Sequence, residues 1–137
     1  MTRHWIGLAL VMVCGQPLAA QQIGPTPGPG GDAPVGVNPY AGNRMATGEG
    51  RKLFNWFNCS GCHGDHAGGG MGPSLRDSSW IYGGGDSQIF ASIAQGRTKG
   101  MPAWGTRLPA EQIWKLVAYI KSLRTSSEPD RPDKGKP

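Results

Sequence analysis

The feature that most constrains this chain is a pentapeptide of two cysteines and a histidine, CSGCH, at residues 59–63. Cys59 and Cys62 are spaced so that one turn of helix-like backbone carries both thiols, and His63 follows directly. This C-x-x-C-H spacing is the attachment signature of a c-type haem. Each thiol would form a thioether with a vinyl group of the porphyrin, and the histidine would bind the iron as its proximal ligand. The pentapeptide therefore predicts one covalently attached haem c.

Two other interpretations of a C-x-x-C pair explain less of the motif. A zinc site needs a second pair of ligands, and the one remaining cysteine is Cys14, near the start of the chain. A thioredoxin-type redox pair does not require a histidine directly after its second cysteine. Both alternatives stay open from the pentapeptide alone, but haem attachment accounts for all three of its reactive side chains.

The first 20 residues have the composition of an export signal. A short positive segment at residues 3–4 precedes an apolar run over residues 5–15, and Leu-Ala-Ala at residues 18–20 forms a suitable cleavage site. The apolar run is shorter than the ~20 residues that a membrane-spanning helix needs. We expect cleavage of this signal peptide and a periplasmic location. A retained N-terminal anchor, which would place the protein at a membrane, and a lipid-anchored cysteine are the alternatives.

Composition divides the remaining chain into a folded part between two polar segments. Residues 21–39 are rich in proline and glycine and have no apolar periodicity, so we expect a flexible linker. Residues 125–137 contain mainly serine, proline and charged residues, which predicts a disordered tail. The folded domain is expected over residues 40–124. The haem would be the covalent staple that lets so small a core hold together.

The charge is modest and does not point to a nucleic-acid partner. The chain has 14 Lys and Arg against 9 Asp and Glu, a formal net charge of +5. Removal of residues 1–20 would leave 13 against 9, a net charge of +4. No run of basic residues of the kind that marks nucleic-acid binding is present. A mildly basic surface suits weak docking on an acidic protein.

Apolar spacing predicts three main helices and no sheet. We expect helices over residues 47–58, 86–95 and 109–123, with Thr47 and Asp86 as the N-caps of the first two. The last helix has apolar residues at i, i+3, i+4 and i+7, and Pro109 suits its first turn. Those apolar residues are Ile113, Leu116, Val117 and Ile120.

Two glycines have predicted roles in these helices. Gly50 gives the first helix a smooth spot, which would let the last helix cross it closely. Gly96 is expected to end the helix over residues 86–95, because glycine readily adopts the left-handed conformation of a C-terminal stop.

A six-coordinate haem needs a second axial ligand from far along the chain, and Met101 is the predicted residue. Gly100 and Pro102 flank it, so it lies in an ordered loop rather than on the apolar face of a helix. The rival is Met71, in a loop that should run along the histidine side of the haem. Ligation by methionine and histidine raises the reduction potential and closes both faces of the iron, which favours one-electron transfer.

Further residues are predicted to surround the haem. Pro73 is expected to offer its carbonyl to the free ring N–H of His63, and Leu75 to pack on the haem. Four residues combine a polar N–H or O–H group with a large body and are candidates for holding the propionates, with ordinary packing as the alternative for each. These are Trp80, Tyr82, Arg97 and Trp104.

Together these motifs resemble those of the class I c-type cytochromes over about residues 45–124. The resemblance rests on five short motifs: Gly50-x-x-x-Phe54, CSGCH at 59–63, GPSL at 72–75, GMP at 100–102 and LVAYI at 116–120. It implies an all-α fold of three to five helices wrapped around one haem, with the terminal helices crossing near Gly50, Phe54 and Tyr119. Pro109 departs from the serine or threonine cap that many members have before the last helix.

A narrower similarity concerns residues 80–84 and 96–104. They are similar to small periplasmic cytochromes that serve quinoprotein alcohol dehydrogenases, and to the haem domains of cbb3-type oxidase subunits. The resemblance implies a soluble, monomeric electron carrier that is not itself an enzyme. It would take electrons from a dehydrogenase and pass them to a terminal oxidase or another cytochrome by transient docking. The alternatives are a haem peroxidase or gas sensor with a displaceable sixth ligand, and a fixed haem subunit of a dehydrogenase or oxidase complex.

Three cations bracket the Met101 loop. Arg97, Lys99 and Arg107 would steer docking on an acidic partner, with a merely solvated loop as the alternative.

Overall fold

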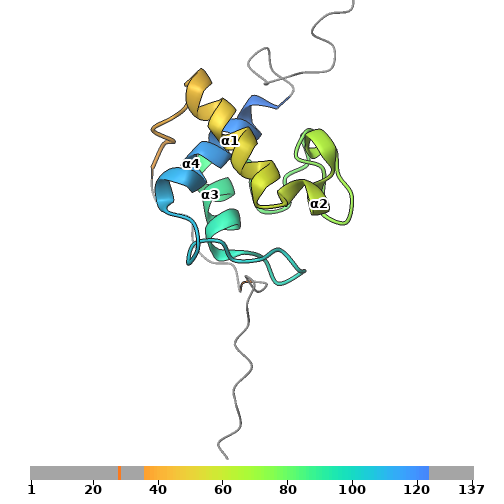
Figure 1. Ribbon diagram of the computed structural model, residues 1–137. Coiled ribbons are helices and arrows are strands. Elements are labelled where there is room, and N and C mark those ends of the chain that lie inside the picture. Colours follow the sequence, from red (N-terminus) through yellow and green to blue (C-terminus); the bar gives the residue numbers. More distant parts are fainter. Residues whose placement is uncertain (1–27, 29–35, 124–137) are drawn as a thin grey trace, which may run out of the picture.

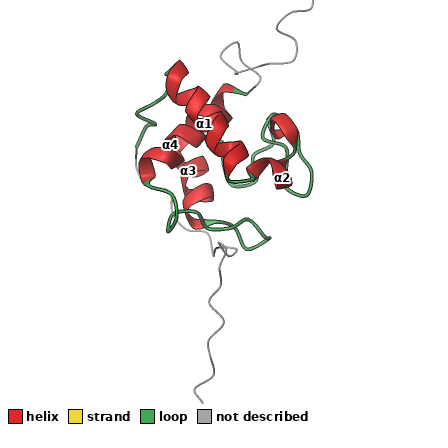
Figure 2. Ribbon diagram, in the orientation of Figure 1, coloured by secondary structure: helices red, strands yellow, loops and turns green. Residues whose placement is uncertain are grey.

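The computed structural model describes Gly28 and residues 36–123 (Figure 1). The predicted export signal, the predicted tail over residues 125–137 and most of the predicted linker lie outside the described residues. Helices and loops make up the described part, as Figure 2 shows. The helices are α1 (Arg44–Trp56), α2 (Cys59–His63), the short 3₁₀ helix η1 (Asp65–Ala67), α3 (Asp86–Gln95) and α4 (Ala110–Ser122).

The predicted all-α class is confirmed. Within Gly28 and residues 36–123 there is no strand, and an isolated β-bridge pairs Arg97 with Met101. None of the helices described there is long and apolar enough to cross a membrane.

The first and last helices cross at the centre of the fold, as predicted. Gly50 of α1 lies directly against α4, where a side chain at this position would clash with the carbonyl oxygen of Lys115. The same added carbon would come within 2.9 Å of the Cβ of Tyr119. One turn later, the rings of Phe54 and Tyr119 meet edge to face with centroids 5.4 Å apart. The absence of a side chain at Gly50 is therefore what lets the two helices approach.

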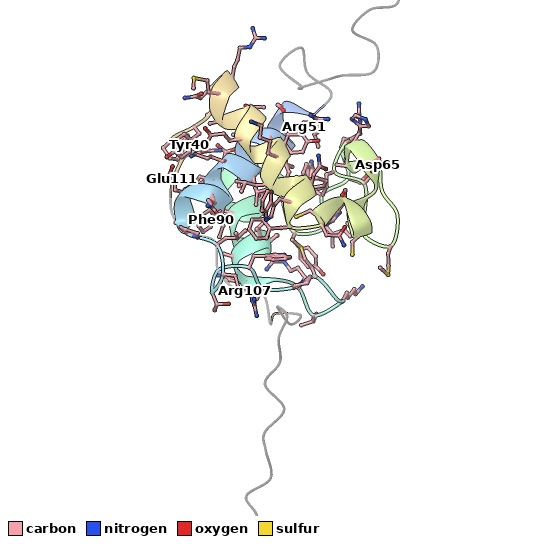
Figure 3. The ribbon with its side chains drawn as sticks, in the orientation of Figure 1. Tyr40, Arg51, Asp65, Phe90, Arg107 and Glu111 are labelled. Atoms are coloured by element: carbon pink, nitrogen blue, oxygen red, sulfur yellow. The ribbon has the colours of Figure 1, made fainter. Side chains whose placement is uncertain are left out.

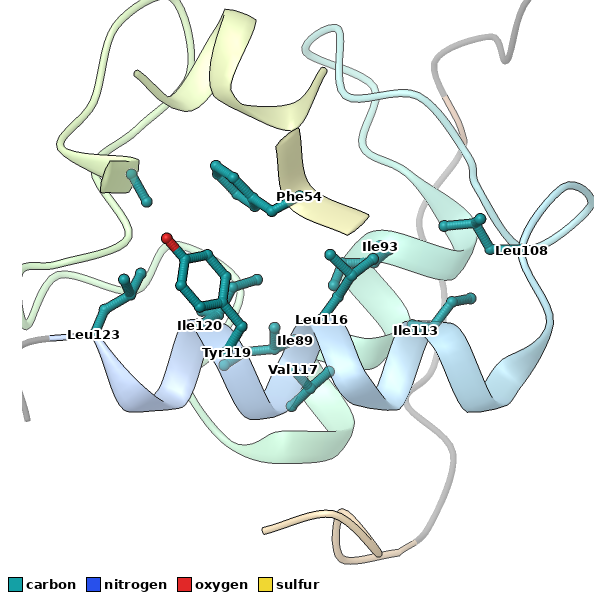
Figure 4. Packing of buried hydrophobic residues seen from close by; sticks show 11 residues of the cluster. Phe54, Ile89, Ile93, Leu108, Ile113, Leu116, Val117, Tyr119, Ile120 and Leu123 are labelled. Carbon is teal, nitrogen blue, oxygen red and sulfur yellow. The ribbon is translucent and has the colours of Figure 1, made fainter. Parts of the chain in front are cut away.

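The core forms around the predicted stripe of α4, seen in Figure 4. All four residues of that stripe are buried, and Phe54 from α1 and Ile89 and Ile93 from α3 pack against them. Burying one such side chain contributes about 1.5–3 kcal/mol. The apolar period of α4 therefore determines which way the other two helices face.

The N-terminus of α1 differs from the prediction. The helix begins at Arg44, and its N-cap is Asn43 rather than Thr47. The side-chain oxygen of Asn43 accepts a hydrogen bond from the Ala46 amide at 3.0 Å. Thr47 is buried, and its hydroxyl donates a hydrogen bond to the Asn43 carbonyl at 2.9 Å. Thr47 therefore stabilises the first turn of α1 from within the helix and does not cap it.

The bounds of α3 agree with the prediction, but its cap does not. Gly85 is the N-cap, and its amide donates to the side-chain oxygen of Gln88 at 3.0 Å. Asp86 instead accepts a hydrogen bond from the Asn38 amide at 3.2 Å. It also lies 3.8 Å from the Lys121 ammonium, so it ties the segment before α1 to α3 and α4.

The helix α1 ends at Trp56, two residues before the predicted end, whereas the ends of α3 and α4 agree with the prediction to within one residue. Gly96 ends α3 with a φ of +68°, in the left-handed region that favours glycine. Pro109 directly precedes α4 as its N-cap.

Substituting Gly50 by alanine tests the helix crossing. The added methyl group meets the backbone of α4, so we expect Gly50→Ala to lower the free energy of unfolding by about 1–3 kcal/mol. Gly48→Ala is the matched control, because Gly48 lies in the same helix with open space around it. Alanine there should stabilise the protein by about 0.5–1 kcal/mol. Thermal unfolding followed by circular dichroism measures both, and equal effects would contradict the crossing.

Candidate haem site

The CSGCH pentapeptide forms the short helix α2, which turns away from the end of α1. Asn58 between the two helices has a left-handed backbone with φ +55°, and Gly64 after α2 has φ +78°. Cys59 is partly buried and Cys62 is exposed, and both are free thiols. One helical turn thus presents both thiols and the His63 ring, as the spacing predicted.

The His63 ring is held by the backbone carbonyl of Pro73. His63 Nδ1 lies 2.8 Å from the Pro73 oxygen. A carbonyl only accepts, so Nδ1 carries the proton and the lone pair of the imidazole is on Nε2. A histidine whose other ring nitrogen donates to a carbonyl is the usual arrangement of an iron or zinc ligand. The geometry supports the role predicted for Pro73.

A glycine-rich loop brings Pro73 back to the histidine. The Gly69 amide donates to the His63 carbonyl at 2.7 Å, and the Gly72 amide donates to the Cys62 carbonyl at 2.8 Å. A side chain at Gly72 would lie 3.1 Å from the His63 ring, which is tighter than ordinary packing. Glycine at this position therefore leaves room for the ring.

The predicted second ligand lies on a tight turn. The Gly100 amide donates to the Arg97 carbonyl at 3.1 Å, and the Arg97 amide donates to the Met101 carbonyl at 2.9 Å. Gly100 adopts φ +110°, a conformation that glycine accepts most readily. Met101 is half-buried and packs against the hydrophobic core.

The chain after Met101 is fixed to the end of α3. The Trp104 amide donates to the Ile93 carbonyl at 3.0 Å, and the Gly105 amide donates to the Ala94 carbonyl at 2.8 Å. These bonds satisfy carbonyls that a helix leaves unpaired at its C-terminus. The loop that carries Met101 is therefore a cap of α3.

The rival methionine has a different environment. Met71 is 86% exposed, in the loop that follows α2. A side chain so exposed makes little contact with the apolar interior. The partial burial of Met101 therefore favours Met101 over Met71 as the ligand.

Half-buried apolar residues surround this region. Of the residues predicted around the haem, Leu75, Trp80 and Trp104 all pack against the core without being fully covered. The rings of Trp104 and Phe57 meet with centroids 5.6 Å apart. A flat, largely apolar cofactor would complete the burial of such side chains, so the lining fits a haem.

Arg97 is a buried cation with an unused donor. It is 9% exposed and donates to Ser92 Oγ at 2.7 Å and to the Gly96 carbonyl at 3.1 Å. Its guanidinium carbon lies 4.6 Å from the centre of the Tyr82 ring. Its Nε is buried and has no hydrogen-bond partner within the described part of the chain. Burying a charge is costly without a counter-charge, so this position fits an anionic group such as a haem propionate.

The same burial corrects the docking hypothesis for Arg97. A side chain covered to this extent does not present its charge to a partner. Lys99 and Arg107 are exposed, and Figure 3 shows Arg107 at the same end of the molecule as the loop that follows α3.

The alternatives for the cysteine pair find little support. Burial raises the pKa of the Cys59 thiol to about 11, whereas thioredoxin-type cysteines have a lowered thiol pKa. Among Gly28 and residues 36–123, no three His, Cys, Asp or Glu side chains come together in a way that could hold a metal ion. The zinc interpretation thus has no ligand set in this part of the chain.

Comparison with known proteins agrees with this chemistry. Residues 46–120 match the family model described as cytochrome c oxidase, cbb3-type, subunit III. The cbb3-type cytochrome c oxidase subunit FixP of Sinorhizobium medicae is 36% identical over 68% of this chain and 36% of that protein. Cytochrome c-L of Methylorubrum extorquens is 33% identical over 70% of this chain and 49% of that protein. The chain thus spans about a third to a half of the length of these relatives.

Solved structures give the same result. The crystal structure of cytochrome cL from Methylophaga aminisulfidivorans matches with a TM-score of 0.61 and 33% identity, over 64% of this chain and 61% of that one. Cytochrome cL from Hyphomicrobium denitrificans matches with a TM-score of 0.60 and 34% identity, over 64% and 52%. The chain therefore belongs to the c-type cytochromes, in the family of the cbb3-type cytochrome c oxidase subunit III.

Proposed function

We propose that this protein is a one-electron carrier with a single haem c, attached through Cys59 and Cys62 and ligated by His63 and Met101. When bound, the haem supplies an iron centre that alternates between the ferric and ferrous states. The observation that carries the proposal is the bond from His63 Nδ1 to the Pro73 carbonyl. It leaves the lone pair on Nε2, with which His63 would hold the haem iron, and makes the imidazole a stronger ligand.

The remaining residues of the site would block the open position of the iron and exclude water from the pocket. Met101 would hold the iron through its sulfur as the second protein ligand, which would leave no place for oxygen or peroxide to bind. Leu75, Trp80 and Trp104 would exclude water from the faces of the cofactor. Arg97 would neutralise a propionate through its free Nε–H, held in place by Ser92 and Tyr82.

The relatives suggest the place of this carrier in electron transport. They include cbb3-type cytochrome c oxidase subunits and cytochrome c-L. We infer a periplasmic monomer that accepts electrons from a dehydrogenase and delivers them to a terminal oxidase or another cytochrome by transient docking. A fixed haem subunit of an oxidase complex is the second candidate, because the oxidase subunits among the relatives share this domain. Co-purification with a larger complex would favour the second candidate over the first.

Spectra of methionine variants test the ligand assignment and separate a carrier from a peroxidase or gas sensor. An iron–methionine bond gives the ferric protein a weak long-wavelength absorption band. We expect this band in the unmodified protein and in Met71→Ala, and its loss in Met101→Ala. The reduced Met101→Ala protein should bind carbon monoxide, because its iron has an open position. If the unmodified protein lacks the band and binds carbon monoxide readily, the closed-iron proposal is wrong.

Haem staining of the same proteins after denaturing electrophoresis provides the control. All three should retain their haem, because Cys59 and Cys62 would hold it covalently whichever methionine is changed. Haem that leaves the unfolded chain would contradict attachment through two thioethers.

Oxidation by small charged reagents tests the role of the two exposed cations. We expect Lys99→Gln combined with Arg107→Gln to slow oxidation by an anionic reagent such as ferricyanide about two- to fivefold at low salt. A cationic cobalt oxidant should react faster with the same variant, and added salt should reduce both effects. Lys52→Gln is the control, because Lys52 is exposed on α1. Equal effects of the two variants would mean that the Met101 loop does not steer docking.

A further inference from the structure

One residue of the predicted linker is buried against the Met101 loop. Gly28 is covered by its neighbours, and its amide donates a hydrogen bond to the Met101 carbonyl at 3.3 Å. It is set apart as the one coloured residue before position 36 in the bar of Figure 1. The sequence alone gives no sign of this contact, since Gly28 lies in a run of alternating glycine and proline.

The Met101 carbonyl thus has two donors from different parts of the chain. The Arg97 amide donates at 2.9 Å and closes the turn that carries Met101. The Gly28 amide uses the second lone pair of the same oxygen, and it comes from outside the turn. The two bonds together fix the backbone of Met101 relative to the end of α3 and to Gly28.

The close approach requires glycine on both sides. A Cβ at position 28 would clash with the carbonyl oxygen of Gln95 and would lie 3.0 Å from the Cβ of Ala103. A Cβ at Gly96 would lie 2.7 Å from the Gly28 nitrogen and 2.5 Å from the Met101 oxygen. The backbone at position 28 therefore packs directly on the backbone at the end of α3. A side chain at position 28 would push this part of the chain away from Met101.

We propose that Gly28 is a positioning residue that holds the Met101 loop in place and thereby strengthens the bond between the methionine sulfur and the iron. The inference rests on the proposed ligation by Met101. A segment outside the helical domain would then set how easily the sixth ligand is displaced.

Competition by imidazole tests this role. Imidazole displaces a weakly held methionine from ferric haem, and loss of the absorption band of the iron–sulfur bond reports the displacement. Loss of one hydrogen bond of ordinary strength should raise the affinity for imidazole about fivefold in Gly28→Ala. Gly48→Ala, which adds the same methyl group in open space, should leave it unchanged. Circular dichroism of both variants should show the helix content of the unmodified protein, because residue 28 lies outside the described helices and alanine at position 48 is compatible with α1.

Amide hydrogen exchange of the unmodified protein gives an independent measurement. The Gly28 amide should exchange at least about tenfold more slowly than an amide in an unstructured peptide of the same sequence. Exchange at the rate of the peptide would overturn the inference, because the bond to Met101 would then be absent.

The outcomes separate this inference from the proposed function. If Met101→Ala loses the absorption band while Gly28→Ala binds imidazole as the unmodified protein does, Met101 is the ligand and the role of Gly28 is wrong. If the unmodified protein lacks the band, the ligand assignment fails, and the inference fails with it. Tighter imidazole binding in Gly28→Ala, with Gly48→Ala unchanged, supports both.

Discussion

The hydrogen bond between His63 Nδ1 and the Pro73 carbonyl is the interaction on which the site depends. It fixes the proton on one ring nitrogen and leaves the lone pair of the other nitrogen available to bind a metal such as the proposed haem iron. The bond exists because the glycine-rich loop after α2 folds back on the carbonyls of Cys62 and His63. A side chain at Gly72 would crowd the imidazole, so the loop and the His63 ring form one unit.

The rest of the fold holds a second unit, the Met101 loop, which lies far from the first unit in sequence and would supply the second iron ligand. The Met101 loop caps the C-terminus of α3, and α3 packs on α4, which crosses α1 at Gly50. Because α1 leads directly into α2, the helix crossing connects the two units through rigid elements. Neither unit lies in the interior of a helix. The histidine unit is attached to the end of α2, and the Met101 loop is attached to the end of α3. The proposed axial ligands thus gain fixed positions while their side chains stay available for a cofactor.

Much of this could be predicted from the sequence, because the determining signals are local. The spacing of Cys59, Cys62 and His63 requires one helical turn, and the apolar period of α4 requires one buried face. The cap of α1 was predicted wrongly because Asn43 and Thr47 are both good capping residues one turn apart, and only the packing of Thr47 decides between them. The contact of Gly28 joins residues far apart in the chain, so no local pattern reveals it. Arg97 is buried by nearby residues, Ser92 and Tyr82 among them, but only the fold of its turn shows that its side chain points inward.

In the proposed site, the His63 nitrogen and the Met101 sulfur would both bind a single haem iron. X-ray absorption at the iron edge measures the number and kind of atoms bound to the metal most directly. We expect five nitrogen neighbours, four from the porphyrin and one from His63, and one sulfur neighbour in the purified ferric protein. Five-coordinate iron, or a sixth neighbour that is oxygen or nitrogen, would contradict it.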